Sequence, residues 1–236
     1  MPRCTIALSA NAGVSITLGG LRVLADALHT KKTGGFSTVS PERWEAMRTL
    51  PSFQNPDFIF FTHCHPDHYS KALTQEAKRL WPAAGLILPE QEFEEQHLLA
   101  GREAAFSHKG VSFRFLRLPH ERGVYAEVPH YGLLLSHEGF QVLLTGDCEV
   151  ASPALKEALR GNPPDLALLD FPWITLSRGR AFLRDVLRLK HLLVCHLPFP
   201  QDDIYGYRGA AEKYLKRVEC PDVRLLGEPF QVESYY

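Results

Sequence analysis

One stretch of this sequence determines both the fold and the chemistry that we expect. Directly after a wholly apolar segment, Phe58 to Phe61, and a single threonine, the chain reads His63-Cys64-His65-Pro66-Asp67-His68. A short apolar run of this kind is typical of a buried strand in the middle of a sheet. The edge where such strands end is where α/β proteins place their functional groups. The three histidines and the aspartate therefore stand at a functional position.

The spacing inside this segment predicts two groups of metal ligands. Side chains alternate along an extended chain, so His63 and His65 point the same way and Cys64 points away. Pro66 makes a turn, after which Asp67 and His68 face a second direction. Two pairs of ligands aimed at two neighbouring points suit two metal ions. The alternative is a polar surface loop, which a lone histidine would favour but this cluster does not.

The rest of the chain alternates short apolar runs with helical patterns. Strands are predicted over 4–9, 14–18, 21–25, 58–61, 86–88, 111–118, 131–136, 140–144, 166–169, 192–195 and 223–226, and helices over 41–50, 70–80, 90–99, 153–159, 178–189 and 209–218. Gly19-Gly20 and Glu138-Gly139 predict tight turns between neighbouring strands. Antiparallel strands followed by strand–helix alternation suit an α/β sandwich of two sheets with helices outside. We find no linker, so we expect a single domain over 1–236.

Composition excludes several classes of protein. The 236 residues are 45% hydrophobic and 22% charged, which argues against disorder. The net charge of -1, from 26 Lys+Arg against 27 Asp+Glu, argues against non-specific nucleic-acid or anionic-membrane binding. Five cysteines form no CxxC pair, and we find no signal-peptide pattern and no apolar run long enough to span a bilayer. A cytoplasmic protein with reduced thiols is the expectation.

The histidine-rich segment resembles the HxHxDH motif of the metallo-β-lactamase superfamily. The resemblance extends over nearly the whole chain. The segment Ala12 to Asp26 looks like the opening hairpin of that family, Thr145-Gly146-Asp147 like its Gly-Asp after a strand, and Cys195-His196 stands where its last histidine ligand follows a late strand. The resemblance implies a four-layer αββα sandwich of two mixed β-sheets with helices on the outer faces.

The same resemblance implies a site for two divalent metal ions. His63 and His65 would bind the first ion, Asp67, His68 and His196 the second, and Asp147 would bridge them. The third histidine of the first ion is either His120 or His130. We prefer His120 because it follows the strand at 111–118, as the other proposed ligands follow theirs, whereas His130 begins the next strand. Zinc is the expected metal, with manganese or iron as alternatives.

Other residues beside these ligands have predicted supporting roles. Asp26 ends a strand and is either a turn residue or an acceptor that orients a ligand histidine, and the resemblance favours the second role. Asp170 also ends a strand, and it either supports the site or caps a turn. Cys64, Cys148 and Cys195 adjoin proposed ligands, and strand alternation favours buried apolar filler over metal ligation.

These ligands predict hydrolysis. Two cations sharing a carboxylate lower the pKa of a bridging water, and the hydroxide attacks a carbonyl or phosphorus centre. Asp67 is a predicted catalytic residue, and whichever of His120 and His130 does not bind metal is a candidate proton shuttle. The expected function is a metal-dependent hydrolase of a small-molecule ester, lactone or phosphodiester. The alternatives are a nuclease or RNA-processing enzyme, an iron-dependent redox enzyme, and a binding module without catalysis.

The substrate itself is little constrained by the sequence. Loops after strands usually shape the pocket. Candidate segments are 29–32, 171–173, 177–180 and 197–207, the last with Phe199, Tyr205 and Tyr207, although these aromatic residues also suit a core. We expect a small-molecule partner, with no nucleic acid and no membrane, and the sequence does not give the oligomeric state. His97, His108, His137 and His191 are expected on the surface.

Overall fold

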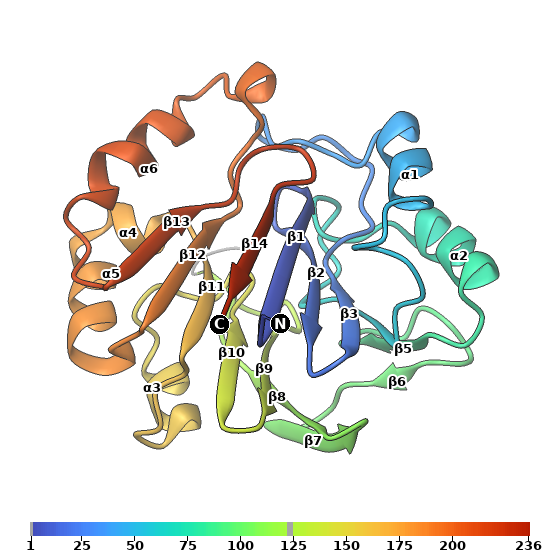
Figure 1. Ribbon diagram of the computed structural model, residues 1–236, viewed down its shortest axis with the longest axis horizontal. Helices are drawn as coiled ribbons and strands as arrows, with labels where there is room; N and C mark the ends of the chain where they lie inside the picture. Colours follow the sequence, from blue (N-terminus) through green and yellow to red (C-terminus); the bar gives the residue numbers. More distant parts are fainter. Residues whose placement is uncertain (1, 122–124) are drawn as a thin grey trace.

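Two seven-stranded sheets form the centre of the molecule (Figure 1). The computed structural model describes residues 2–121 and 125–236. The first sheet has the order β14 (Val232–Tyr235), β1 (Cys4–Ala10), β2 (Gly13–Leu18), β3 (Leu21–Ala25), β4 (Phe58–Phe60), β5 (Gly85–Leu88) and β6 (His97–Leu98). The second has the order β13 (Asp222–Leu225), β12 (His191–Cys195), β11 (Leu166–Asp170), β10 (Phe140–Leu144), β9 (Tyr131–His137), β8 (Val111–Arg117) and β7 (Glu103–His108).

Both sheets are mixed, as the sequence predicts. In the first sheet β1, β2 and β3 are antiparallel, and β3 to β6 are parallel. Gly19 and Gly20 join β2 to β3 with φ of 58° and 80°, a conformation that favours glycine in a tight hairpin. In the second sheet β7 to β10 are antiparallel and β10 to β13 are parallel. Strands that run in the same direction end at the same edge of their sheet.

Helices cover the outer faces of the sandwich, with α1 and α2 beside the first sheet and α3 to α6 beside the second (Figure 1). They are α1 (Pro41–Met47), α2 (Lys71–Leu80), α3 (Pro153–Leu159), α4 (Pro172–Thr175), α5 (Ser177–Phe182) and α6 (Tyr207–Leu215), with a π-helical turn at Leu183–Leu187 and a 3-10 turn at Pro200–Asp202. The fold is the expected αββα sandwich. None of the helices described is long and apolar enough to cross a membrane.

Alternating side chains of the second sheet divide the core into two parts. In β11, Leu166 and Leu168 belong to the cluster packed between the sheets. Ala167 and Leu169 belong to the cluster that packs against α3 to α6. This is the period-two pattern of a strand buried on both faces, and it explains why the sequence of β11 is continuously apolar.

The helix predicted over 90–99 is wrong. This segment forms a loop followed by the short strand β6. The side chain of Gln96 accepts hydrogen bonds from the backbone N–H groups of Glu92 and Phe93 and donates one to the carbonyl of Glu90. These bonds replace those of a helix. Repulsion between like charges four positions apart, such as Glu90 and Glu94, also disfavours the helix.

Several other elements differ from the prediction. Strands β6, β7 and β14 were not predicted, because their residues do not show a clear apolar alternation. The helix predicted over 178–189 is divided into α5 and the π-helical turn, which ends at Arg188 with a left-handed φ of 47°. These differences lie away from the edge of the sheets where the predicted ligands gather.

Candidate metal centre

The predicted ligands come together where strands of both sheets end. Asp26 follows β3 and His63 follows β4 in the first sheet. His120 comes after β8, Asp147 after β10 and His196 after β12 in the second sheet. Because the two sheets face each other, residues that are more than 100 positions apart meet at one edge, as the 3.2 Å between Nε2 of His68 and Nε2 of His196 shows.

Three groups of side chains have ligand atoms within 4.8 Å of one another, and they share members. These groups are His63, His65 and His120; His63, His68 and Asp147; and Asp67, His68 and His196. The first and third correspond to the two predicted ion sites. The middle group shares His63 with the first and His68 with the third, and it adds Asp147. The structure therefore brings together all seven residues that were predicted as ligands when His120 is taken as the third histidine of the first site.

The distances between ring nitrogens fit metal ions. Nε2 of His68 lies 3.2 Å from Nε2 of His196, and Nε2 of His120 lies 3.4 Å from Nε2 of His63. Two ligands bound tetrahedrally to one zinc ion at their usual bond lengths are about 3.3 Å apart. Oδ1 of Asp147 adds an oxygen 3.2 Å from Nε2 of His68 and 3.4 Å from Nε2 of His196. Nitrogen and oxygen donors converging in this way suit divalent cations.

Asp26 and Thr62 orient the histidines. Oδ2 of Asp26 lies 3.0 Å from Nδ1 of His68, and the Thr62 hydroxyl donates to the same oxygen at 2.7 Å. The backbone N–H of Thr62 donates to Oδ1 of Asp26 at 2.7 Å, and the Thr62 hydroxyl lies 3.0 Å from Nδ1 of His63. Nδ1 of both histidines is thus engaged behind the site, which leaves Nε2 of each facing the centre.

The backbone at two of these residues is unusual. Asp26 and His196 adopt left-handed φ angles of 50° and 57°. Such angles are uncommon outside glycine, and they occur often at functional sites. Each of these two residues is the first after its strand, β3 for Asp26 and β12 for His196.

The charges of the cluster are those of a site built for cations. Burial alone lowers the pKa of His68, but the carboxylates of Asp147 and Asp26 outweigh it and raise that pKa well above the usual range. Burial raises the pKa of Asp147, whereas His68 and His196 hold it well below the usual value. Burial and the positive charge of His68 lower the pKa of His63 well below normal. The carboxylates therefore attract positive charge, and the lowered pKa keeps His63 neutral, as a histidine must be to bind a cation.

The environments of His120 and His130 differ. The ring of His120 is part of the group with His63 and His65. His130 is fully buried, both of its ring nitrogens lack a hydrogen-bond partner among the residues described, and burial lowers its pKa to about 3. Its ring centre is 5.3 Å from that of His63, and it belongs to none of the groups. The geometry thus favours His120 as the third histidine of the first site.

Asp170 and the neighbouring cysteines lie behind the centre. One carboxylate oxygen of Asp170 is buried without a hydrogen bond among the residues described. Burial, followed by repulsion from Asp147, raises the pKa of Asp170 well above its usual value. Cys148 and Cys195 are buried, and burial raises the pKa of both thiols well above normal. Neutral, buried thiols at Cys148 and Cys195 suit the predicted role of apolar filler, whereas Cys64 is only partly buried.

A family model matches most of the chain. Residues 21–181 match the model of the beta-lactamase superfamily domain. This segment contains every predicted ligand except His196. The chain is a member of the metallo-β-lactamase superfamily. A search of curated protein sequences found no significant match.

Solved structures show the same superfamily fold. Igni18, described as a novel metallo hydrolase from the archaeon Ignicoccus hospitalis, has a TM-score of 0.68 at 15% identity and covers 99% of this chain and 98% of its own. An isothiocyanate hydrolase from Delia radicum gut bacteria has a TM-score of 0.65 at 15% identity, with 98% of both chains covered. CmlA, a diiron beta-hydroxylase from Streptomyces venezuelae, has a TM-score of 0.69 at 14% identity over 99% of this chain and 54% of its own. At these identities the likeness is one of fold.

Aromatic side chains stand on both sides of the superfamily site. The ring of Tyr125 is 4.9 Å from that of His65, and the ring of Phe36 meets that of His196 edge-on at 4.3 Å. Of the aromatic residues predicted to line a pocket, Phe199 is fully buried, whereas Tyr205 is 62% exposed. Sequence reasoning missed Thr62 and Phe36. Thr62 carried a signal because it precedes the motif directly, but nothing in the sequence places Phe36 beside His196.

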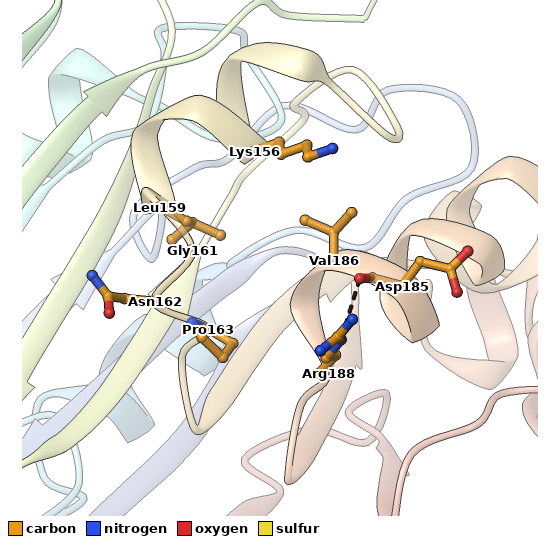
Figure 2. A pocket seen from close by; sticks show the side chains of 8 residues that line it. All are labelled: Lys156, Leu159, Gly161, Asn162, Pro163, Asp185, Val186 and Arg188. Atoms are coloured by element: carbon orange, nitrogen blue, oxygen red, sulfur yellow. Dashed lines mark hydrogen bonds between the residues drawn. The ribbon is translucent and has the colours of Figure 1, made fainter.

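A cavity lies at the other edge of the second sheet, and none of the predicted ligands lines it. It has a volume of about 410 Å³ and is lined by Lys156, Leu159, Gly161, Asn162, Pro163, Asp185, Val186 and Arg188 (Figure 2). These residues precede β11 and β12, whereas the metal centre follows them. Arg188 donates a hydrogen bond to the backbone carbonyl of Asp185 across its wall. The cavity is therefore separate from the metal centre.

Proposed function

We propose that this chain is a dinuclear metal-dependent hydrolase, with zinc as the expected metal. We further propose that its substrate is a small-molecule ester, lactone or phosphodiester. Two pairs of facing histidine nitrogens carry the proposal. Nε2 of His68 lies 3.2 Å from Nε2 of His196, and Nε2 of His120 lies 3.4 Å from Nε2 of His63. Both separations suit a bound cation. Superfamily membership and the fold shared with metal-dependent hydrolases support it.

The residues divide the work between holding the ions and orienting the ligands. We propose that His63, His65 and His120 hold one ion, that Asp67, His68 and His196 hold the other, and that Asp147 contacts both. When bound, two divalent cations supply Lewis acidity and an activated water. Asp26 and Thr62 hold His63 and His68 in place through Nδ1, so that little reorganisation is needed during the reaction.

Asp67 lies beside His196 and is partly exposed. Its carboxylate lies 4.0 Å from Nε2 of His196 and is partly exposed, so it can hold a proton beside the substrate. The burial of His130 argues against its predicted role as proton shuttle, because a proton donor must reach the leaving group. We therefore assign proton transfer to Asp67, and we assign His130 no contact with the substrate.

Metal analysis combined with a hydrolysis screen tests the proposal. The purified protein is expected to bind two metal ions per chain and to hydrolyse at least one member of a set of esters, lactones, thioesters and phosphodiesters. Asp67→Ala should abolish hydrolysis, whereas Asp185→Ala, at the distant cavity, should not change it. Full activity after complete metal removal contradicts the proposal. Oxygen consumption by an iron-loaded protein would favour the redox alternative.

A further inference from the structure

A shelf of aromatic side chains extends outward from the metal centre. It begins at Phe36, whose ring meets that of His196 edge-on at 4.3 Å. Phe36 stacks on Tyr207 with ring centres 5.4 Å apart, and Tyr207 in turn contacts Phe171 at 4.9 Å and Tyr205 at 5.6 Å. We call these four residues the aromatic shelf. Its rings form one chain of contacts that starts at a proposed metal ligand.

The aromatic shelf faces solvent where a core would not. Tyr205 is 62% exposed and the adjacent Ile204 is 71% exposed, whereas Phe36, Phe171 and Tyr207 are half-buried. Exposed apolar groups gathered next to a functional site are typical of a binding surface. The shelf therefore has apolar area available for a ligand.

Polar contacts below the shelf fix its position. Asp202 accepts hydrogen bonds from the Ser37 hydroxyl at 2.8 Å and from Lys32 at 2.6 Å, and the Ser37 hydroxyl accepts one from the backbone N–H of Phe199 at 2.7 Å. These bonds tie the loop that carries Phe36 to the loop that carries Tyr205. Asp203 accepts from the backbone N–H groups of Tyr207 and Arg208. Both acidic side chains are thus used in holding the shelf and do not compete for the ligand.

Gly35 allows the two loops to meet. It has a left-handed φ of 82°, and a Cβ at this position would lie 3.1 Å from Cγ1 of Ile204 and 3.3 Å from Cδ2 of Tyr205. Glycine therefore lets the backbone before Phe36 pack closely against the outer end of the shelf. The shelf is a preorganised surface, which reduces the entropy lost when a ligand binds.

We propose that the aromatic shelf is the substrate subsite for a flat apolar group, best an aromatic ring, joined to the bond that reacts beside His196. This inference rests on the proposed function and narrows it: an apolar ester or lactone fits the shelf better than a phosphodiester does. The ring would stack on the shelf while the reacting group lies over Asp67 and His196. A protein partner or a second copy of the chain is disfavoured, because the shelf is continuous with a proposed metal ligand.

Two thiols that bind the same metal test the shelf without relying on turnover. The cobalt-loaded protein is titrated with 2-phenylethanethiol and with ethanethiol, which have similar acidity, and binding is read from the visible spectrum of the cobalt. We expect the phenyl compound to bind at least about tenfold more tightly. Any change in the metal itself affects both thiols, so it cancels in the ratio of their Kd values.

Variants assign the preference to the shelf. Phe36→Ala and Tyr205→Ala should each reduce the Kd ratio by about threefold or more, whereas Tyr236→Ala, which removes a ring that is 82% exposed at the chain end, should not change it. An unchanged ratio in the double variant Phe36→Ala/Tyr205→Ala overturns the subsite. A protein that binds no cobalt overturns the proposed function and the subsite together. A dimer in sedimentation that Tyr205→Ala dissociates also overturns the subsite, in favour of self-association.

Discussion

The two edges of the second sheet differ in what their loops hold. At the edge where β10, β11 and β12 end, buried and partly buried histidines and carboxylates converge, and Asp26 and Thr62 orient His63 and His68. At the edge where β11 and β12 begin, there is a cavity of about 410 Å³ whose charged residues lie on the surface (Figure 2). There, Oδ1 of Asp185 lies 2.8 Å from Nε of its neighbour Arg184, and both side chains are exposed.

The largest described free volume of this sheet and its reactive groups therefore lie at opposite edges. A surface ion pair such as Asp185–Arg184 contributes little, because water screens it and can replace either partner. The partly buried carboxylate of Asp147 is compensated by the neighbouring positive charge of His68 and His196. The edge with the perturbed pKa values, and not the edge with the open cavity, is therefore the candidate for function.

The largest effect is expected from removing the charge of Asp147. In Asp147→Asn we expect the affinity for at least one metal ion to fall by more than about 100-fold, since changes behind the ligands alone cost 10–100-fold. Isothermal titration with zinc measures this affinity. The matched control Asp185→Asn should bind zinc as the wild type does. Equal losses in both variants would show that the effect is general destabilisation.

The next test separates His120 from His130. At saturating zinc, we expect His120→Ala to retain one ion per chain and His130→Ala to retain two, because only His120 has a ring nitrogen in a ligand group. Mass spectrometry of the native protein counts the ions. His130→Ala is also expected to lower the free energy of unfolding, by about 2 kcal/mol, because it leaves a cavity. Retention of both ions by His120→Ala would contradict the assignment.

Asp26→Ala should reduce both stability and metal affinity. It leaves the N–H of Thr62 and Nδ1 of His68 without their buried acceptor, at an expected cost of about 3 kcal/mol in the free energy of unfolding. Zinc affinity should fall by about 10–100-fold because His68 loses its orientation. The control is Asp165→Ala at the opposite edge, where Asp165 accepts from the backbone N–H of Gln141 and from Lys190. There we expect a smaller loss of stability and no change in zinc affinity.

The last effect concerns pH and leaves the metal centre itself unchanged. His29 is fully buried, and burial lowers its pKa to about 4 although Nε2 lies near the carbonyl of Ala10. Its pKa in the unfolded chain is about 6.5, so the unfolded state takes up a proton first as the pH falls. The free energy of unfolding should therefore decrease between pH 6.5 and pH 4, by up to about 3 kcal/mol from this residue.

Urea unfolding at several pH values measures this dependence. His29→Gln should show a weaker decrease than the wild type over the same pH range. His97→Gln, which changes an exposed histidine, should follow the wild type. A pH dependence that is identical in all three proteins would contradict the assignment to His29.

The sequence predicted the parts of the molecule that local patterns encode. The strand before His63 follows from its apolar run, whereas the sandwich and the site residues at the ends of β3, β10 and β12 followed from the resemblance of the motif to the family. The helix predicted over 90–99 failed because a single side chain, Gln96, takes over the backbone hydrogen bonds. No local pattern carries that contact.

Contacts between distant segments were also beyond the sequence. Phe36 lies beside His196, although the two are far apart in the chain. No sequence motif includes both residues. The sequence favoured His120 over His130 only because it follows a strand, and the 3.4 Å between Nε2 of His120 and Nε2 of His63 adds the direct contact that the sequence could not give. Thr62 was closer to prediction, because its position before the motif makes it a neighbour of Asp26 once β3 and β4 pair in parallel.

Anomalous X-ray scattering from a zinc-loaded crystal tests the central claim most directly. We predict two peaks about 3.5–4 Å apart, one beside His63, His65 and His120 and the other beside Asp67, His68 and His196, with Asp147 between them. Peaks that lie elsewhere, or a centre that holds fewer than two ions at saturating zinc, would contradict the dinuclear account.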